Sequence, residues 1–254
     1  MHFIRRLFLL LIVWGVALST FSDARTPDVV AHVKVSLFDD AHIAPATLAQ
    51  ARVRATFLMA QAGIGLEWLN CPAADPSDFT PAVSPCSVVE WPRHLSVRIV
   101  LRGNSANPEP ETFGRAFLDD AGCGVYAKVY YQNLVASRDI LQLTEGDMLG
   151  FVIAHELGHL LLGSNSHSTT GVMQAHWTAT TLHEAAHNTL FFTSAQAATL
   201  RSRLSRASMD LAHASSSPVT LADGRSSASS RPLAGITTIT TSPPSSVFAR
   251  LLPR

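Results

Sequence analysis

The chain has 254 residues, enough for one domain with a full hydrophobic core plus terminal extensions. Hydrophobic residues make up 47% of it and charged residues only 15%, which is typical of a globular body. Its 19 basic and 19 acidic side chains balance, so nothing in the charge indicates nucleic-acid binding and we expect no nucleic-acid partner.

The N-terminus has the pattern of an export signal. Two arginines precede an apolar run at residues 7–21, and Ser22 and Ala24 then supply small side chains at the cleavage positions. We therefore predict a signal peptide over residues 1–24 and a secreted or periplasmic protein with no stable membrane association after cleavage. The alternative is an uncleaved anchor helix, but the run is short for a membrane span, which takes about 20 apolar residues.

The chain that follows predicts a strand, a helix and a second strand. Apolar residues alternate in VAHVKVSLFDD, residues 30–40, as they do in a half-buried strand. Residues 44–62 have apolar side chains at helical spacing, and two glycines end the run. The segment IGLEWLNC, residues 64–71, predicts the second strand.

Three cysteines are present in this exported chain, and export permits disulfides. Cys71 and Cys86 bracket the proline-rich segment CPAADPSDFTPAVSPC, and we predict a disulfide between them. In the chain-entropy model, such a bridge stabilises a fold by about 3 kcal/mol. Cys123 is then unpaired. We interpret it as a small buried residue, with a metal-ligating or metal-blocking thiolate as the alternative.

Three further strand candidates follow in the middle of the chain. The segments HLSVRIVLR (94–102) and GVYAKVYYQNL (124–134) are the stronger ones, and GRAFLD (114–119) between them is weaker. The next segment, EGDMLGFVIAHELGHLLL (145–162), predicts a long apolar helix.

Both ends of that helix carry termination signals. Thr144, with Asp147 three residues later, resembles a capping box at its start. Gly163 is a natural left-handed residue at its end.

A last helix is predicted at residues 193–207. Residues 213–254 are rich in Ser, Thr, Pro and Ala and predict a disordered tail.

The order of the predicted elements indicates an α+β fold with a mixed, mostly parallel, twisted sheet of four to five strands. Two long helices pack on the sheet, and a C-terminal helix follows.

The helix at 145–162 carries the pattern of a zinc site. His155 and His159 are four residues apart, so both imidazoles lie on one helix face, about one turn apart. Glu156 starts beside them and can accept a proton from a water whose pKa zinc lowers towards about 7. We therefore predict Zn²⁺ as the cofactor and Glu156 as the catalytic general base.

Two histidines leave the metal short of a ligand, and three residues compete for the third place. His167 follows the turn at Gly163, and His176 lies further along, where we favour a plain surface role for it. Glu184 belongs to a second HExxH copy, HEAAH at residues 183–187. No apolar run precedes that copy, so we interpret it as a solvated helical turn.

The stretch HELGHLLLGSNSH, with GVM after it, resembles the metzincin clan of zinc peptidases, most nearly its matrixin-like members. The resemblance implies that residues 25–212 form a metzincin-like zinc peptidase domain. It implies three zinc ligands, namely His155, His159 and His167. It also implies that Met173 is the turn methionine beneath the metal, and that the segment 114–119 is an edge strand that binds the substrate backbone antiparallel.

This chain departs from the family's spacing. In the family, the glycine is three residues after the second histidine, and the third histidine is three residues after the glycine. Here both steps are four residues, from His159 to Gly163 and from Gly163 to His167, which gives HExxHxxxGxxxH. Asn165 stands at the family's strict third-ligand spacing.

The function implied is that of a secreted zinc-dependent endopeptidase acting on a peptide or protein substrate. One alternative is a gluzincin-type peptidase with Glu184 as the third ligand. Another is a non-catalytic exported domain that binds zinc or a peptide. Structural zinc sites usually fill all four positions with protein donors, often cysteine. Glu156 and the lack of nearby cysteines therefore favour an open, catalytic site.

Overall fold

A computed structural model describes residues 28–72, 85–102, 112–136, 143–216 and 246–251. The predicted signal peptide, residues 1–24, lies outside these ranges. Within them, every helix is too short or too polar to cross a membrane.

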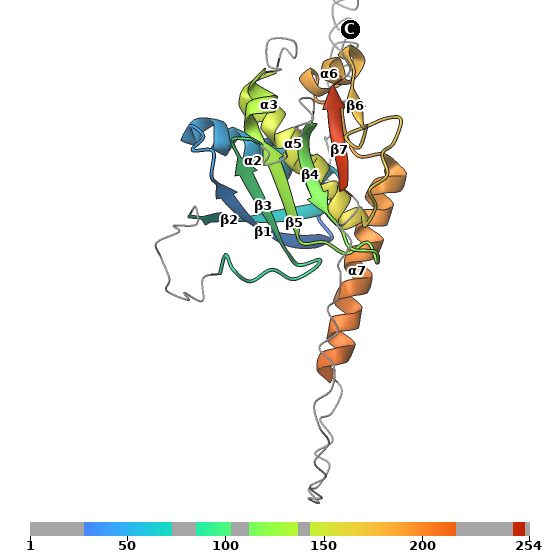
Figure 1. Cartoon of the computed structure of the whole chain (residues 1–254). Helices are drawn as coiled ribbons and strands as arrows, with labels where there is room; N and C mark the ends of the chain where they lie inside the picture. Colours follow the sequence, from blue (N-terminus) through green and yellow to red (C-terminus); the bar gives the residue numbers. More distant parts are fainter. Residues whose placement is uncertain (1–27, 73–84, 103–111, 137–142, 217–245, 252–254) are drawn as a thin grey trace, which may run out of the picture.

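A mixed, mostly parallel sheet forms the centre of the molecule (Figure 1). Its strands are β1 (Ala31–Asp39), β2 (Ile64–Cys71), β3 (His94–Val100), β4 (Thr112–Phe117), β5 (Tyr126–Tyr130), β6 (His176–Trp177) and β7 (Ser246–Leu251). They lie in the order β2-β1-β3-β5-β4-β7-β6. β1, β2, β3 and β5 are parallel to their neighbours in this group, whereas β4 is antiparallel to both β5 and β7.

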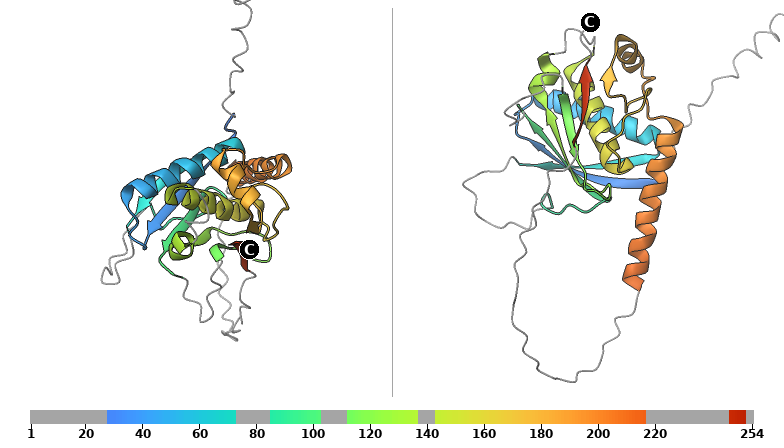
Figure 2. Two further views of the ribbon diagram at one scale, coloured as in Figure 1. Left: turned by 90° about the horizontal axis from the view of Figure 1, so that it is seen from above. Right: turned by 45° about the vertical axis from the view of Figure 1, so that its right-hand side comes forward.

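Two long helices, α2 (Pro45–Gln61) and α5 (Glu145–Leu162), pack against each other and against the sheet (Figure 2). The other helices are α3 (Tyr131–Ala136), α6 (Ala179–Ala186) and α7 (Ser194–Ser216). Every residue of α5 from Met148 to Leu161 is buried. A helix that is apolar on all sides belongs in a core, and polar side chains on it are therefore held away from solvent.

The predicted ends of α5 are confirmed. The Thr144 hydroxyl accepts a hydrogen bond from the Asp147 amide at 3.0 Å, which satisfies one free amide of the first turn. Gly163 ends the helix in the left-handed conformation, with φ at 64°. The chain therefore reverses direction immediately after the second histidine of the motif.

The predicted fold class is confirmed: the sheet is mixed and mostly parallel, two long helices pack on it, and a C-terminal helix follows. The segment 124–134 differs in detail, because the strand ends at Tyr130 and α3 begins there. β6 and β7 extend the sheet beyond the predicted five strands.

The tail also differs from the prediction. α7 continues to Ser216, and residues 246–251 form β7 beside β4. The segment 114–119 corresponds to β4, but β4 is not at the edge of the sheet because β7 pairs with its outer side. β7 has the sequence SVFARL and is a short apolar stretch in surroundings rich in Ser, Thr and Pro, so the composition of the whole tail does not reveal it.

The predicted disulfide is confirmed. Cys71 and Cys86 are bonded, with their Cα atoms 5.8 Å apart, so the end of β2 is joined to the segment that leads into β3. Cys123 is free and half-buried. It lies in a turn after β4, where its amide donates to the Asp119 carboxylate at 2.8 Å.

Candidate metal centre

The two motif histidines of α5 face each other in the protein interior. His155 and His159 are both fully buried, and their Nε2 atoms are 3.0 Å apart. The i, i+4 spacing on a regular helix places them on one face, as expected.

Backbone carbonyls fix the protonation of both rings. His155 Nδ1 lies 2.8 Å from the Val172 carbonyl oxygen, and His159 Nδ1 lies 2.8 Å from the Ser164 carbonyl oxygen. A carbonyl only accepts, so each Nδ1 carries the proton and donates it. Both Nε2 atoms therefore present lone pairs to each other, and neither can donate to the other. A cation between them relieves this arrangement.

The geometry fits zinc. Zn–N bonds of about 2.0–2.1 Å at tetrahedral angles place two ligand nitrogens about 3.3 Å apart. The observed 3.0 Å separation is close to that value. Histidines that bind zinc commonly donate their other ring N–H to a carbonyl or carboxylate, which orients the ligand as here.

His167 completes a group of three. One ligand atom from each of His155, His159 and His167 lies within 4.8 Å of the others. The His167 ring is centred 5.3 Å from that of His155 and 4.9 Å from that of His159. Its Nε2 is buried and has no hydrogen-bond partner among the described residues. The structure thus brings together the three histidines that the metzincin resemblance implies.

The extra residues on either side of Gly163 are absorbed by the turn. Gly163 ends the helix in the left-handed conformation, and the carbonyl of the next residue, Ser164, accepts the hydrogen bond from His159 Nδ1. His167 returns to the helix from this turn. Asn165, which stands at the family's usual position, is not one of the grouped donors.

Burial keeps the three imidazoles neutral. It lowers the pKa of His155 well below the usual value, with the neighbouring His159 acting in the same direction. Burial lowers the pKa of His159 to about 4, and it also lowers the pKa of His167. Metal ligation needs the neutral ring, so the histidines are in the binding form at neutral pH.

Glu156 is also fully buried. Burial raises the pKa of its carboxyl well above the usual value, and the Ala116 amide and the charge of Arg115 oppose this rise. Space for the carboxylate depends on Gly114 in β4, because a Cβ atom there would lie 2.4 Å from Glu156 Oε1. A cation beside the carboxylate favours its charged form.

Met173 packs against α5 beside the two histidines. It is fully buried, and a Cβ atom at Gly158 would lie 2.5 Å from its sulfur. The Met173 carbonyl accepts a hydrogen bond from the Ser168 amide at 2.9 Å, which closes the turn that carries it. This position agrees with the turn methionine implied by the resemblance.

The other two candidates for the third ligand lie outside the group. Glu184 is half-buried on α6, and among the described residues only the three histidines form a set with metal-ligand spacing. The second HExxH copy forms the end of α6 with both histidines exposed, so its interpretation as a helical turn is confirmed.

His176 is not the plain surface residue that we favoured. It is half-buried on β6, its Nδ1 is buried, and it lies close enough to His167 to lower the pKa of that residue.

Two features of the site could not be predicted from the sequence, namely the role of Gly114 and the backbone carbonyls that orient the histidines. Backbone carbonyls have no side-chain signature, and a lone glycine in a strand has many explanations.

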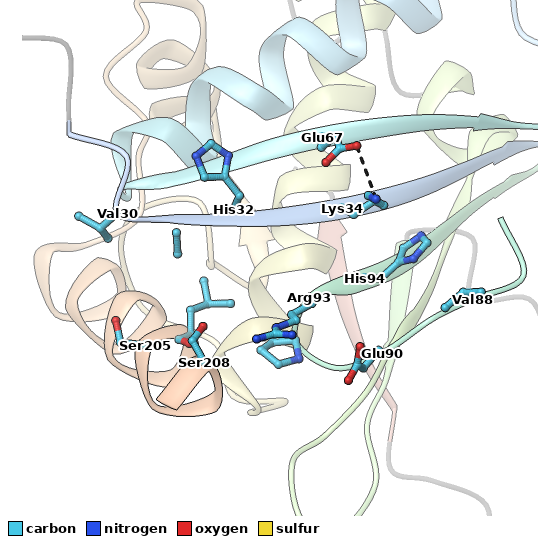
Figure 3. A pocket seen from close by; sticks show the side chains of 13 residues that line it. Val30, His32, Lys34, Glu67, Val88, Glu90, Arg93, His94, Ser205 and Ser208 are labelled. Atoms are coloured by element: carbon cyan, nitrogen blue, oxygen red, sulfur yellow. Dashed lines mark hydrogen bonds and ion pairs between the residues drawn. The ribbon is translucent and has the colours of Figure 1, made fainter. Parts of the chain in front are cut away.

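A separate cavity of about 600 Å³ lies beside β1 and α7 (Figure 3). Its lining includes His32 and His94 and the exposed ion pair between Lys34 and Glu67, whose atoms are 3.6 Å apart. None of the three grouped histidines lines it, so it is not part of the candidate metal centre.

Comparisons with known proteins give only distant similarities. No protein-family model matches the sequence, and no curated protein matches it. Archaemetzincin from Methanopyrus kandleri is similar in structure, with 17% identity, a TM-score of 0.43, and coverage of 69% of this chain and 97% of that one. A zinc-dependent peptidase from Methanocorpusculum labreanum has 13% identity, a TM-score of 0.42, and coverage of 65% and 99%. These values are too low to assign a family or a function to this chain.

Proposed function

We propose that this chain is an exported zinc-dependent endopeptidase of the metzincin type, with His155, His159 and His167 as its zinc ligands. One observation carries the proposal. The Nε2 atoms of His155 and His159 lie 3.0 Å apart with their lone pairs facing each other, and the Nε2 atom of His167, which has no hydrogen-bond partner among the described residues, lies beside them. Three histidines leave a fourth position open, which is the pattern of catalytic zinc rather than structural zinc.

Glu156 is the general base in this proposal. When bound, zinc supplies a Lewis acid that polarises a carbonyl and lowers the pKa of a coordinated water. Burial raises the pKa of Glu156, and a cation bound beside it would favour the charged form, in which the carboxylate would accept a proton and later deliver it to the leaving amine. Gly114 provides the space in which the carboxylate lies.

The substrate in this proposal is an extended peptide. It adds to the outer side of β4 as an antiparallel strand, so its backbone passes the glycine beside which Glu156 lies. Main-chain hydrogen bonds give such binding its affinity, and side-chain pockets give it specificity. The position of Met173 beside the ligands supports the metzincin assignment.

Zinc content and cleavage of a peptide library test this proposal together. We expect about one zinc per chain, cleavage of internally quenched peptides, loss of cleavage after treatment with a chelator, and recovery when Zn²⁺ is returned. His183 is exposed and lies outside the histidine group, so His183→Ala serves as a control that should change neither result.

Two results would contradict the proposal. Zinc binding at one per chain without cleavage of any peptide would identify a non-catalytic zinc-binding domain. Cleavage that survives complete removal of zinc would exclude the zinc-dependent chemistry.

A further inference from the structure

β7 lies between β4 and β6 and pairs with both (Figure 1). It is antiparallel to β4, with Phe117 opposite Ser246 and Thr112 opposite Arg250. It is parallel to β6, with His176 opposite Arg250 and Trp177 opposite Leu251. Residues 246–251 therefore lie between these two strands, paired with β4 along most of their length and with β6 at Arg250 and Leu251.

Both neighbours of β7 belong to the surroundings of the candidate metal centre. β4 contains Gly114, beside which the Glu156 carboxylate lies. The pairing of β4 with β7 is irregular between Thr112 and Arg115, so Gly114 sits in this irregular stretch. On the other side, the Trp177 ring of β6 is centred 6.4 Å from the ring of His155.

A peptide substrate and β7 need the same backbone groups. An added strand binds through the N–H and C=O groups on the outer side of β4, and β7 already uses them. The parallel pairing with β6 closes the opposite side as well. An extended peptide therefore cannot pair with the outer side of β4 while β7 is in place.

We propose that residues 246–251 are an intramolecular inhibitor that occupies the position of a substrate strand between β4 and β6. This inference rests on the proposed peptidase function and adds its regulation by the chain's own C-terminal segment. Residues 217–245 connect the segment to α7, so β7 binds as a tethered ligand. The effective concentration of a tethered ligand reaches about the millimolar range, so a segment with an intrinsic dissociation constant of about 100 μM occupies its site about tenfold in excess.

Prolines in β7 of the full-length chain test this inference. Val247→Pro combined with Ala249→Pro removes two backbone donors from β7, an internal strand of the sheet, where proline is not tolerated. We expect kcat/KM for a quenched peptide to rise about tenfold, because the outer side of β4 becomes free to pair with the peptide. The matched control is Ala234→Pro combined with Thr237→Pro, which places two prolines in the connecting segment and leaves kcat/KM unchanged.

Hydrogen exchange of the zinc-loaded protein provides a readout that does not depend on cleavage. Backbone amides of residues 112–117 should exchange faster in the β7 proline variant than in the wild type and the control, because those that face β7 lose their partners. Unchanged exchange would show that β7 does not pair in solution and would overturn the inference. Faster exchange with unchanged, measurable kcat/KM would also overturn it, because the segment would not block substrate. Faster exchange with no cleavage by any variant would instead contradict the proposed peptidase function and uphold the pairing.

Discussion

Glu156→Gln is expected to lower peptide hydrolysis by about 10²- to 10⁴-fold, the usual contribution of a general base. Glutamine has nearly the same shape as glutamate but cannot accept a proton at neutral pH. Because Glu156 is not one of the three grouped donors, zinc content should stay near one per chain. The measurement is kcat/KM for a quenched peptide, together with zinc content, on the same purified variant.

The fold should survive this substitution. Glu156 is fully buried and burial disfavours its charged form, so a neutral side chain of the same size removes a desolvation cost from the metal-free protein. Glu145→Gln is the matched control, since it changes a carboxylate at the start of the same helix that accepts a hydrogen bond from the Tyr131 hydroxyl and lies outside the histidine group. We expect wild-type kcat/KM for this control. Full activity of Glu156→Gln would remove Glu156 from the role of general base.

The second large effect concerns the third ligand. His167→Ala should weaken zinc binding by at least about 100-fold and abolish peptide cleavage. Even residues that only orient a ligand cost about 10- to 100-fold in metal affinity when replaced, and removal of a direct ligand exceeds this. The affinity is measured by competition with a chromophoric zinc chelator.

Glu184→Ala is the companion variant, because Glu184 is the third ligand in the gluzincin alternative. It lies on α6 outside the histidine group, so zinc affinity and kcat/KM should stay close to those of the wild type. The reverse pattern, in which Glu184 is essential and His167 is dispensable, would replace the metzincin assignment with the gluzincin one.

Local signals in the sequence predicted much of the fold. Residues 64–71 form a strand over the predicted range, and the helix 145–162 begins after Thr144 and ends before Gly163 as its capping residues indicate. Each of these features depends on side chains within a few residues of one another. Capping and alternation are therefore readable without knowledge of the tertiary structure.

Features that depend on distant partners were not predictable. β7 is stabilised by β4, more than 120 residues earlier in the chain, and its surroundings are rich in Ser, Thr and Pro. The metzincin resemblance implied His167, but without it the choice among His167, His176 and Glu184 depends on the direction in which the chain leaves α5. The left-handed conformation of Gly163 sets that direction, and the spacing alone left all three candidates open.

The variant spacing around Gly163 has a simple structural basis. One more helical residue rotates the exit of the chain by about 100°. The additional residue after Gly163 allows the chain to return, with the Ser164 carbonyl bonded to His159 and His167 placed against both other rings. The longer motif thus reaches the same set of three donors through a wider turn.

The central claim is that His155, His159 and His167 hold one zinc ion with a fourth position open. An anomalous difference map, recorded at the zinc absorption edge from crystals of the zinc-loaded full-length protein, tests it most directly. The claim predicts one strong peak with the Nε2 atoms of all three histidines at about 2.0–2.1 Å and no fourth protein side chain on the metal. A peak bound by Glu184, His176 or Cys123, or no peak between His155 and His159, would contradict it.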